Sequence, residues 1–212
     1  MNNKIITIDG PAGSGKERIA KYLSKRWNLY HLDSGVLYRR ISYIILKNDI
    51  NFKDFSEIKD LFKQIKLISP RNNKILRTEK ISNLASKIAT IKIIRDFINI
   101  QQKKIVKNEL KKRGCVIDGR DIGSVVFKNA NIKIYVIVDA KIRAKRRHKQ
   151  LIDIGEKSIY AKILKDIKLR DKTDKTRKNS PLVVPKGAKI INNSHTFKKT
   201  IAQIRNIIEG II

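Results

Sequence analysis

Residues 4–18 read KIITIDGPAGSGKER, and the topology of the chain follows from this stretch. A short apolar run, Ile5 to Ile8, predicts a buried strand. It leads directly into Gly10-Pro11-Ala12-Gly13-Ser14-Gly15-Lys16, which has G-x-x-x-x-G-K spacing. Glycines let the backbone approach a ligand closely, so that several N–H groups converge on phosphate oxygens where the next helix begins. The stretch predicts a nucleoside triphosphate site; the alternative is a glycine-rich strand-to-helix turn with an incidental lysine.

The residues after Lys16 depart from the usual pattern of this loop. Ser or Thr commonly follows the lysine and helps to organise Mg²⁺, but this chain has Glu17 and Arg18. Glu17 suits the positive end of a helix, although it would lie near triphosphate charge, which Arg18 would offset. The residues that bind a metal therefore stay unknown from the sequence.

Length and composition indicate one folded domain. A chain of 212 residues with 41% hydrophobic residues can bury a sizeable core. Its one cysteine, Cys115, lies in an apolar run and excludes an internal disulfide. The apolar start is too short for a secretory signal, and no run approaches a membrane span. We expect a cytoplasmic protein, a monomer that has no contact with a membrane.

The net charge of +30, from 49 Lys and Arg against 19 Asp and Glu, is the composition's strongest bias. Such charge favours salt-sensitive association with nucleic acid. The lysines are nevertheless spread along the whole chain, without a basic tail and with few aromatic residues between them. We therefore expect weak adhesion to RNA at low salt and no specific nucleic-acid partner.

Apolar strand patterns alternate with helical patterns along the chain. Strands are predicted over 4–9, 30–33, 114–118, 132–138 and 188–192, and helices over 15–26, 36–47, about 79–112, 140–152, 158–171 and 196–208. Apolar strands alternating with helices predict an α/β fold, in which a doubly wound, five-stranded parallel sheet has helices on both faces. Ligands of such sheets bind at the carboxyl ends of the strands.

Two segments fit the sheet less well. Residues 48–80 predict a small insert with a helix over 55–65, a strand at 67–68 and a turn at 70–73. Residues 172–186 are polar and predict a mobile loop or lid. The expected organisation is a single domain, 1–212, with a core over 1–47, 81–155 and 187–212, an insert over about 48–80 and a lid over about 156–186.

Three polar clusters follow predicted strands or helices. Asp33 or Ser34 is placed to cap the helix beginning at Val36, or else Ser34 and Arg39 bind an anion. Arg120, bracketed by Asp118 and Asp121, forms either a structural ion pair or part of a site. Arg170, Asp174 and Arg177 share one helix face at i, i+4 and i+7, which alone is typical of a solvated face, as are Arg143, Arg146 and Arg147.

Beside a bound triphosphate, these arginines would act together. Phosphoryl transfer needs positive charge around the reacting phosphates, in-line positioning and a closing lid, and little covalent chemistry. His31, His148 and His195 show no spacing of a metal site or catalytic triad. We expect them to be structural.

Together, ITIDGPAGSGK, LDSGVLYR, Asn83-Leu84-Ala85-Ser86 leading to Arg95, DGRDIGSVVF and RDKTDKTRKNSPLVVP make the chain resemble the bacterial cytidylate kinases, over nearly its whole length. These are P-loop nucleoside monophosphate kinases that use ATP and Mg²⁺ to phosphorylate CMP and dCMP. The resemblance implies a P-loop NTPase-type fold with an insert that binds the nucleoside monophosphate. The enzyme would be a phosphotransferase of pyrimidine nucleotide metabolism.

The resemblance also implies roles for individual residues. Gly10, Pro11, Ala12, Gly13, Ser14, Gly15, Lys16, Glu17 and Arg18 would bind the ATP phosphates, and Lys16, Arg120, Arg170 and Arg177 would be catalytic. Ser34, Arg39, Arg120 and Arg177 would bind the acceptor phosphate, Ser86, Arg95 and Asp121 the cytosine, and Arg170 and Asp174 the sugar or the phosphates. The chain departs from the family in a shorter insert and in Asn192-Asn193, where an aspartate is usual.

Three alternatives stay open at the level of sequence. The first is a P-loop small-molecule kinase with a different acceptor, against which Ser86, Arg95 and Asp121 argue. The second is a basic nucleic-acid-binding protein that keeps a nucleotide loop. The third is a degenerate kinase that binds nucleotides but turns over slowly because of Glu17 and Arg18.

Overall fold

The computed structural model describes residues 3–65, 74–153 and 155–209. The chain forms two compact units. Residues 1–32 and 112–212 make the first, here called the sheet unit, and residues 33–111 make the second, the helical unit.

The predicted α/β fold is confirmed, with a parallel sheet of five strands in the order β2-β3-β1-β4-β5. The strands are β1 (Ile5–Asp9), β2 (Tyr30–Asp33), β3 (Cys115–Gly119), β4 (Ile132–Ile137) and β5 (Lys189–Asn192). Central β1 pairs on both sides, with Ile6 opposite Val116 of β3 and opposite Ile132 of β4. Each predicted strand therefore agrees with an observed one to within a residue at either end.

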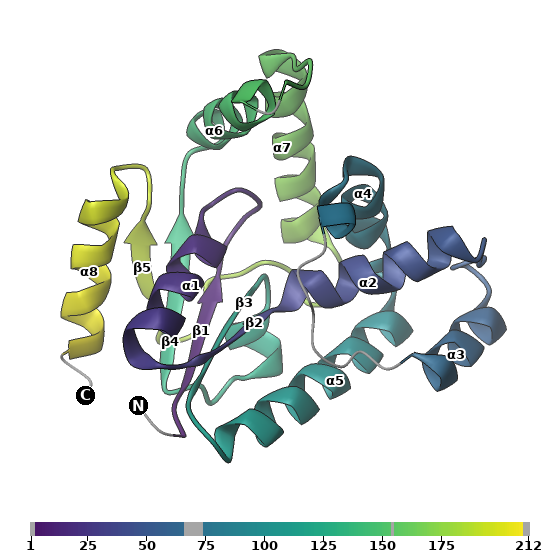
Figure 1. Ribbon diagram of the computed structural model, residues 1–212, viewed down its shortest axis with the longest axis horizontal. Coiled ribbons are helices and arrows are strands. Elements are labelled where there is room, and N and C mark those ends of the chain that lie inside the picture. Colours follow the sequence, from purple (N-terminus) through teal and green to yellow (C-terminus); the bar gives the residue numbers. More distant parts are fainter. Residues whose placement is uncertain (1–2, 66–73, 154, 210–212) are drawn as a thin grey trace. The chain divides into compact units, whose positions relative to one another are not determined.

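A hydrophobic core of the sheet unit forms between strands and two helices. The two helices are α1 (Lys16–Trp27) and α8 (Phe197–Glu209), which lie beside the strands (Figure 1). Their apolar side chains pack on the strands. Ile19 and Leu23 of α1 and Ile204 of α8 are fully buried against this face of the sheet. The phosphate loop starts after β1 and ends at Lys16, where α1 begins. The packing of α1 on the sheet therefore fixes the Lys16 end of the loop.

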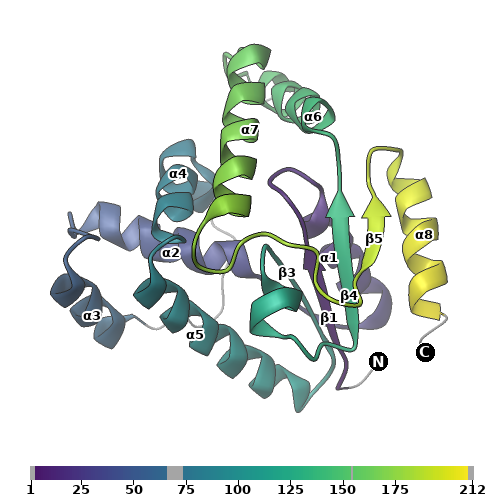
Figure 2. The same cartoon turned by 180° about the vertical axis from the view of Figure 1, so that it is seen from behind.

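Helices α6 (Ala140–Asp153) and α7 (Tyr160–Thr176) form a hairpin beyond the carboxyl ends of the strands (Figures 1 and 2). The prediction of a loop from 172 is wrong for its first five residues, because α7 continues to Thr176. The hydroxyls of Thr173 and Thr176 donate to the carbonyls of Leu169 and Lys172, one turn earlier. The polar composition predicts that the helix ends at residue 171, but in the structure it continues through both threonines.

The helical unit contains α2 (Ser34–Lys47), α3 (Phe55–Gln64), η1 (Lys74–Arg77), α4 (Glu79–Ile88) and α5 (Lys92–Leu110). The single helix predicted over 79–112 is wrong, because it breaks between α4 and α5. At the break, Thr90 N and Ile91 N donate to carbonyls only three residues back, and the Thr90 hydroxyl donates to Lys87 O. The predicted strand at 67–68 and turn at 70–73 lie outside the described residues.

Two expectations from composition concern single features. The thiol of Cys115 is buried in β3 and forms no disulfide, as expected for a small core residue. Within the described ranges, no helix combines the length and the apolar character needed to cross a membrane.

Candidate functional site

The loop between β1 and α1 has the backbone that its glycines allow. Gly13 and Gly15 have φ angles of 71° and 83°, in the left-handed region that favours glycine. A Cβ on Gly10 would lie 2.6 Å from the carbonyl oxygen of Val136 in β4. The loop therefore needs glycine for conformation at two positions and for close approach at the third.

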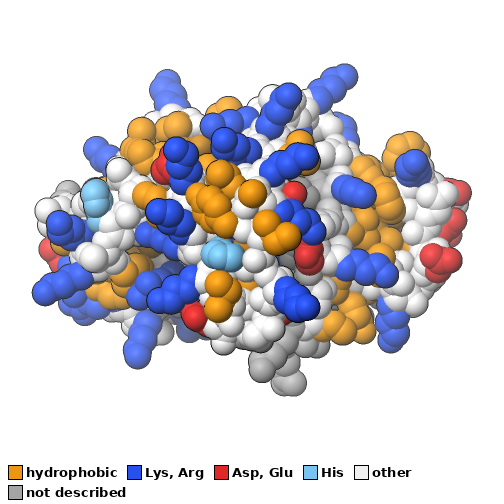
Figure 3. Space-filling view, turned by 90° about the horizontal axis from the view of Figure 1, so that it is seen from above, with side chains coloured by type: hydrophobic (Ala, Val, Ile, Leu, Met, Phe, Trp, Pro, Cys, Tyr) orange, Lys and Arg blue, Asp and Glu red, His pale blue; other side chains and the backbone are white. Residues whose placement is uncertain are grey.

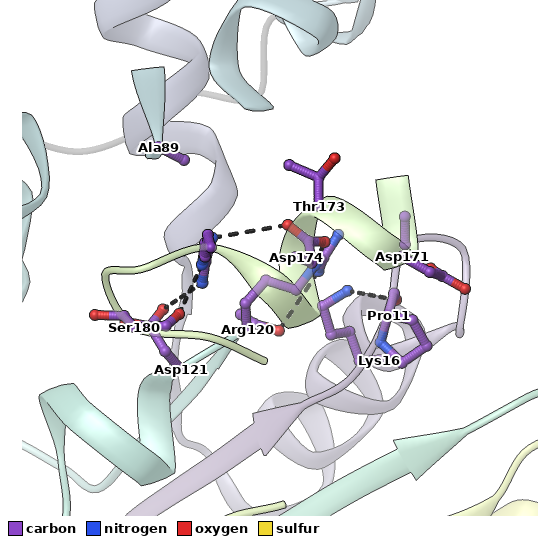
Figure 4. A network of polar contacts seen from close by, with 12 residues as sticks. Pro11, Lys16, Ala89, Arg120, Asp121, Asp171, Thr173, Asp174 and Ser180 are labelled. Atoms are coloured by element: carbon purple, nitrogen blue, oxygen red, sulfur yellow. Dashed lines mark hydrogen bonds and ion pairs between the residues drawn. The ribbon is translucent and has the colours of Figure 1, made fainter. Parts of the chain in front are cut away.

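Three side chains hold the carbonyl groups of this loop. Lys16 Nζ donates to Pro11 O at 3.2 Å (Figure 4), Arg143 Nη1 to Ala12 O at 3.0 Å, and Asn193 Nδ2 to Ser14 O at 2.7 Å. In a planar trans peptide the N–H points opposite to the C=O. The N–H groups that follow these carbonyls therefore point away from the three donors, as a phosphate-binding loop requires.

Arg143 of α6 is a buried structural cation. Only 4% of the residue is exposed, and its guanidinium also donates to Val138 O and, with both Nη atoms, to the Asp171 carboxylate of α7. The prediction of a solvated face is therefore wrong for Arg143, although it holds for Arg147, which is exposed. Arg146 donates to Asn193 O at 2.8 Å.

The two unusual residues after Lys16 have partners on the outer side of α1. Glu17 forms an ion pair with Lys21, one helical turn later, at 2.7 Å. The Arg18 guanidinium carbon lies 3.9 Å from the centre of the Phe197 ring of α8. Stacking on an aromatic ring stabilises the Arg18 cation.

Helix α8 contacts residues at the end of the loop in two ways. Its Phe197 ring packs on Arg18, and its Thr200 hydroxyl donates to Asn193, which in turn donates to Ser14 O.

Beside the loop, two arginines and two aspartates form a buried network (Figure 4). Arg120 Nε donates to Asp174 Oδ2 at 2.8 Å, and Arg177 lies 3.7 Å from both Asp174 Oδ1 and Asp121 Oδ1. Burial acts to raise the pKa of Asp174, but the cations of Arg120, Arg170 and Arg177 together hold it below its usual value. The network thus keeps two carboxylates among cations of the kind that bind phosphate.

The predicted residues of this network come together in the sheet unit. Arg120 and Asp121 follow β3, Asp174 lies in the last turn of α7, and Arg177 caps that helix and donates to Ser180 O at 2.6 Å. Arg170, one turn before Asp174, lies close enough to lower the pKa of Asp174.

The other predicted substrate residues lie in the helical unit. Asp33 caps α2 by accepting from Val36 N, and it also accepts from Arg39 Nη2 at 2.8 Å. The capping interpretation is confirmed for Asp33, and Ser34 is the first helical residue and is buried. Binding of an anion by Ser34 and Arg39 stays a prediction. Ser86 lies on α4 and is partly buried.

Arg95, also in the helical unit, is held in the first turn of α5. Only 2% of the residue is exposed, Nη1 donates to Ala89 O at 2.8 Å, and the guanidinium faces the Tyr38 ring at 5.7 Å. The break between α4 and α5 therefore supplies the carbonyl that orients Arg95.

Asp9 is a functional candidate that the sequence analysis missed. It is fully buried at the end of β1 and accepts from Ile122 N at 2.8 Å and Gly123 N at 2.7 Å. Burial raises its pKa to about 6, although both N–H groups act to lower it. The available signal was a carboxylate that ends an apolar strand immediately before the phosphate loop.

Two of the three histidines contact a polar side chain. His31 Nε2 lies 2.7 Å from Asp118 Oδ1, and His148 Nδ1 lies 2.7 Å from the Ser158 hydroxyl. In the part of the chain that the structure describes, no three His, Cys, Asp or Glu side chains are grouped to hold a metal ion.

Comparison with known proteins agrees with this geometry. The family model for cytidylate kinase matches residues 6–211. A cytidylate kinase from Fusobacterium nucleatum is 41% identical over 191 residues, which cover 86% of each chain, and one from Bartonella bacilliformis is 35% identical over 100% of this chain and 97% of its own. The crystal structure of a shikimate kinase from Bacteroides thetaiotaomicron shares the fold, with a TM-score of 0.52 at 11% identity, over 97% of this chain and 98% of that one. The resemblance and the expectation of a kinase are thereby confirmed, and this chain belongs to the cytidylate kinase family.

Proposed function

We propose that this protein transfers the γ-phosphoryl group of ATP to the phosphate of CMP or dCMP, with ADP and CDP or dCDP as products. The observation that carries the proposal is the phosphate loop whose carbonyls are held by Lys16, Arg143 and Asn193. It lies in a chain whose family phosphorylates these substrates. The buried cysteine suits the reducing cytoplasm that we expect for it.

The donor side of the reaction uses residues Gly10 to Arg18. The loop N–H groups and the start of α1 would bind the ATP phosphates, and Lys16 would exchange its contact with Pro11 O for the terminal phosphates. A bond then forms between the γ-phosphorus and an acceptor phosphate oxygen, while the bond from that phosphorus to the ADP oxygen breaks. Arg120, Arg170 and Arg177 would neutralise the charge of this transition state.

The proposed residues of the acceptor side are those that the resemblance implies. Ser34, Arg39, Arg120 and Arg177 would bind the CMP phosphate, Ser86, Arg95 and Asp121 would bind cytosine, and Arg170 and Asp174 would bind the sugar or the phosphates. Cytosine has an amino donor beside two acceptors, which a carboxylate and a guanidinium complement. Uracil reverses this order at two positions, at a cost of about 1–3 kcal/mol for each unpaired buried group.

The residues near Lys16 would contribute little to binding Mg²⁺ directly. Glu17 is paired with Lys21, and neither position after Lys16 supplies a hydroxyl. Mg²⁺ usually keeps several waters and needs only one or two carboxylates in addition to substrate phosphates. The chain therefore fits an ion held mainly by ATP oxygens and water, which would screen the charge of the phosphates.

The proposal is tested by ADP release with ATP and Mg²⁺, with CMP, dCMP, UMP, AMP and shikimate as acceptors. We expect rapid turnover with CMP and dCMP alone. Turnover with another acceptor instead would identify a different small-molecule kinase. CMP binding without turnover would identify a degenerate kinase and direct attention to Glu17 and Arg18.

Lys16→Ala is expected to abolish turnover, because the variant removes the charge that the loop directs at the terminal phosphates. Lys25→Ala, at an exposed position on the same helix, is the matched control and should retain turnover. Steady-state rates at saturating ATP and CMP compare the two. A Lys16→Ala enzyme as active as the original would contradict the mechanism.

Asp121→Ala is expected to weaken selection for cytosine, because the variant removes the carboxylate proposed to accept from the amino group of the base. The ratio of kcat/KM for CMP to that for UMP should fall by about tenfold or more. An unchanged ratio would remove Asp121 from the base site.

A further inference from the structure

The end of β1 joins the phosphate loop to the segment that follows β3. Asp9 is the last residue of β1, and Gly10 begins the loop. Each carboxylate oxygen of Asp9 accepts one backbone hydrogen bond, Oδ1 from Ile122 and Oδ2 from Gly123. These are the first two residues of η2 (Ile122–Val126), a single π-helical turn that directly follows Arg120 and Asp121.

The turn η2 is pressed closely against β1. A Cβ on Gly123 would lie 2.7 Å from the Thr7 hydroxyl oxygen, 3.2 Å from Asp9 Oδ2 and 3.2 Å from Pro185 Cγ. The first N–H groups of a helical turn have no partner within it. At η2 these two N–H groups are buried and are satisfied by one carboxylate.

We propose that Asp9 is a positioning residue that fixes Arg120 and Asp121 relative to the phosphate loop through the N–H groups of Ile122 and Gly123. Asp121 and Ile122 are consecutive residues joined by a peptide bond. A fixed Ile122 N–H group therefore restricts the movement of the Arg120–Asp121 segment. The proposal rests on the proposed function, in which these two residues bind CMP. In this proposal Asp9 acts through the two amides and touches neither nucleotide.

The hydrogen bonds require the ionised carboxylate. A carboxylate accepts at both oxygens, whereas a protonated carboxyl group turns one oxygen into a donor. Burial, and to a smaller extent the charge of Asp121, raises the pKa of Asp9 to about 6, while Lys16 and the two N–H groups lower it. From β4, Tyr135 faces Asp9, and burial together with the Asp9 charge raises the pKa of that phenol. Protonation below about pH 6 should therefore release one N–H group.

Asp9→Asn and Thr7→Val test the proposal by kinetics. Asparagine keeps the size of the side chain but replaces one acceptor with an NH₂ donor that faces an N–H group. Thr7 is buried on the same strand and its hydroxyl has no hydrogen-bond partner among the described residues, so Thr7→Val is a matched control of nearly equal volume. We expect Asp9→Asn to raise KM for CMP about tenfold or more, with KM for ATP changed less than about threefold, and Thr7→Val to leave both unchanged. An Asp9→Asn enzyme with normal KM for CMP would overturn the proposal.

Amide proton shifts supply a readout that needs no catalysis. In ligand-free protein, the chemical shifts of the Ile122 and Gly123 amide protons should change together as the pH is varied between 5 and 8. In Asp9→Asn these shifts should not change. Ligand-free protein is required because the CMP phosphate itself titrates near pH 6. Ile122 and Gly123 amide shifts that are the same in the unaltered protein and in Asp9→Asn would overturn the proposal even in an active kinase. If they titrate in a protein that does not phosphorylate CMP, the role of Asp9 in fixing the segment stands and the proposed function fails.

Discussion

Single side chains decide the shape of the phosphate loop. The glycines permit its backbone, but donors distant in sequence select one conformation by binding its carbonyls. Asn193 shows this most directly, because its amide donates to Ser14 O while its oxygen accepts from Thr200. A Cβ on Gly15 would collide with the same amide nitrogen, so Asn193 and Gly15 depend on each other.

Asn193→Ala is therefore expected to weaken both the fold and ATP binding. Loss of two buried hydrogen bonds should reduce the free energy of unfolding by about 1–3 kcal/mol. Asn192→Ala, at the exposed neighbouring position, should change it by less than about 0.5 kcal/mol. Chemical denaturation measures both, and KM for ATP should rise only in Asn193→Ala. Equal effects of the two variants would contradict this role.

Asp174 should make stability depend on pH in the acid range. A carboxylate whose pKa is lowered by folding stabilises the folded state above the pKa of the unfolded chain, and this contribution is lost as the pH falls through both values. The difference in unfolding free energy between the unaltered protein and Asp174→Asn should be constant above about pH 5 and shrink below about pH 4. Denaturation at several pH values tests this, and a constant difference down to pH 3 would contradict it.

Sequence could predict residues whose role follows from local spacing. Examples are Gly10, Gly13, Gly15 and Lys16, whose roles are indicated by the sequence of the loop itself. Asp9 and Arg143 could not be placed in the same way, since their partners lie more than a hundred residues away or on another helix. From sequence alone, an arginine among other basic residues on a helix is predicted to be exposed to solvent. Only the structure shows the carbonyl and carboxylate groups that bind Arg143.

At the scale of elements, the α6–α7 hairpin is held by the Arg143–Asp171 pair, whose side chains are 3% and 17% exposed. The same arginine binds Ala12 O, so the orientation of the hairpin and the phosphate loop are linked within the sheet unit. Helix α7 in turn carries Arg170 and Asp174.

Asp171→Ala is expected to lower the free energy of unfolding by about 2–4 kcal/mol, because it leaves a buried guanidinium without its carboxylate. Asp166→Ala, at an exposed position on the same helix, is the control and should cost less than about 0.5 kcal/mol. Thermal unfolding compares the two. A loss no greater in Asp171→Ala than in Asp166→Ala would show that the pair does not hold the hairpin.

The elements themselves were predictable where burial decides them. The three central strands β1, β3 and β4 are largely apolar and buried, the edge strands β2 and β5 are more exposed, and the positions of all five agree with prediction. The break at residues 89–91 and the last turn of α7 were not predictable. In the first, helical periodicity continues through the break; in the second, threonine hydroxyls and the Arg120–Asp174 pair stabilise a polar segment.

The dominant property of the whole molecule is its charge of +30. In the face shown in Figure 3, Lys and Arg side chains are distributed over the surface between apolar and neutral groups. Within the sheet unit, in contrast, arginines are paired with Asp174, Asp121 and Asp171. We expect binding of nucleic acid by such a surface to be nonspecific and to depend on counterion release.

We therefore expect any affinity for RNA to disappear with salt while phosphorylation of CMP persists. Binding to RNAs of unrelated sequence should be equal at 50 mM salt and fall by about a hundredfold or more by 300 mM, because several phosphate contacts are screened together. At 300 mM salt, added RNA should not change KM for CMP. Fluorescence anisotropy and the ADP-release assay measure the two effects. Tight, salt-resistant binding to one RNA, in a protein without CMP turnover, would instead favour a nucleic-acid-binding protein that retains a nucleotide loop.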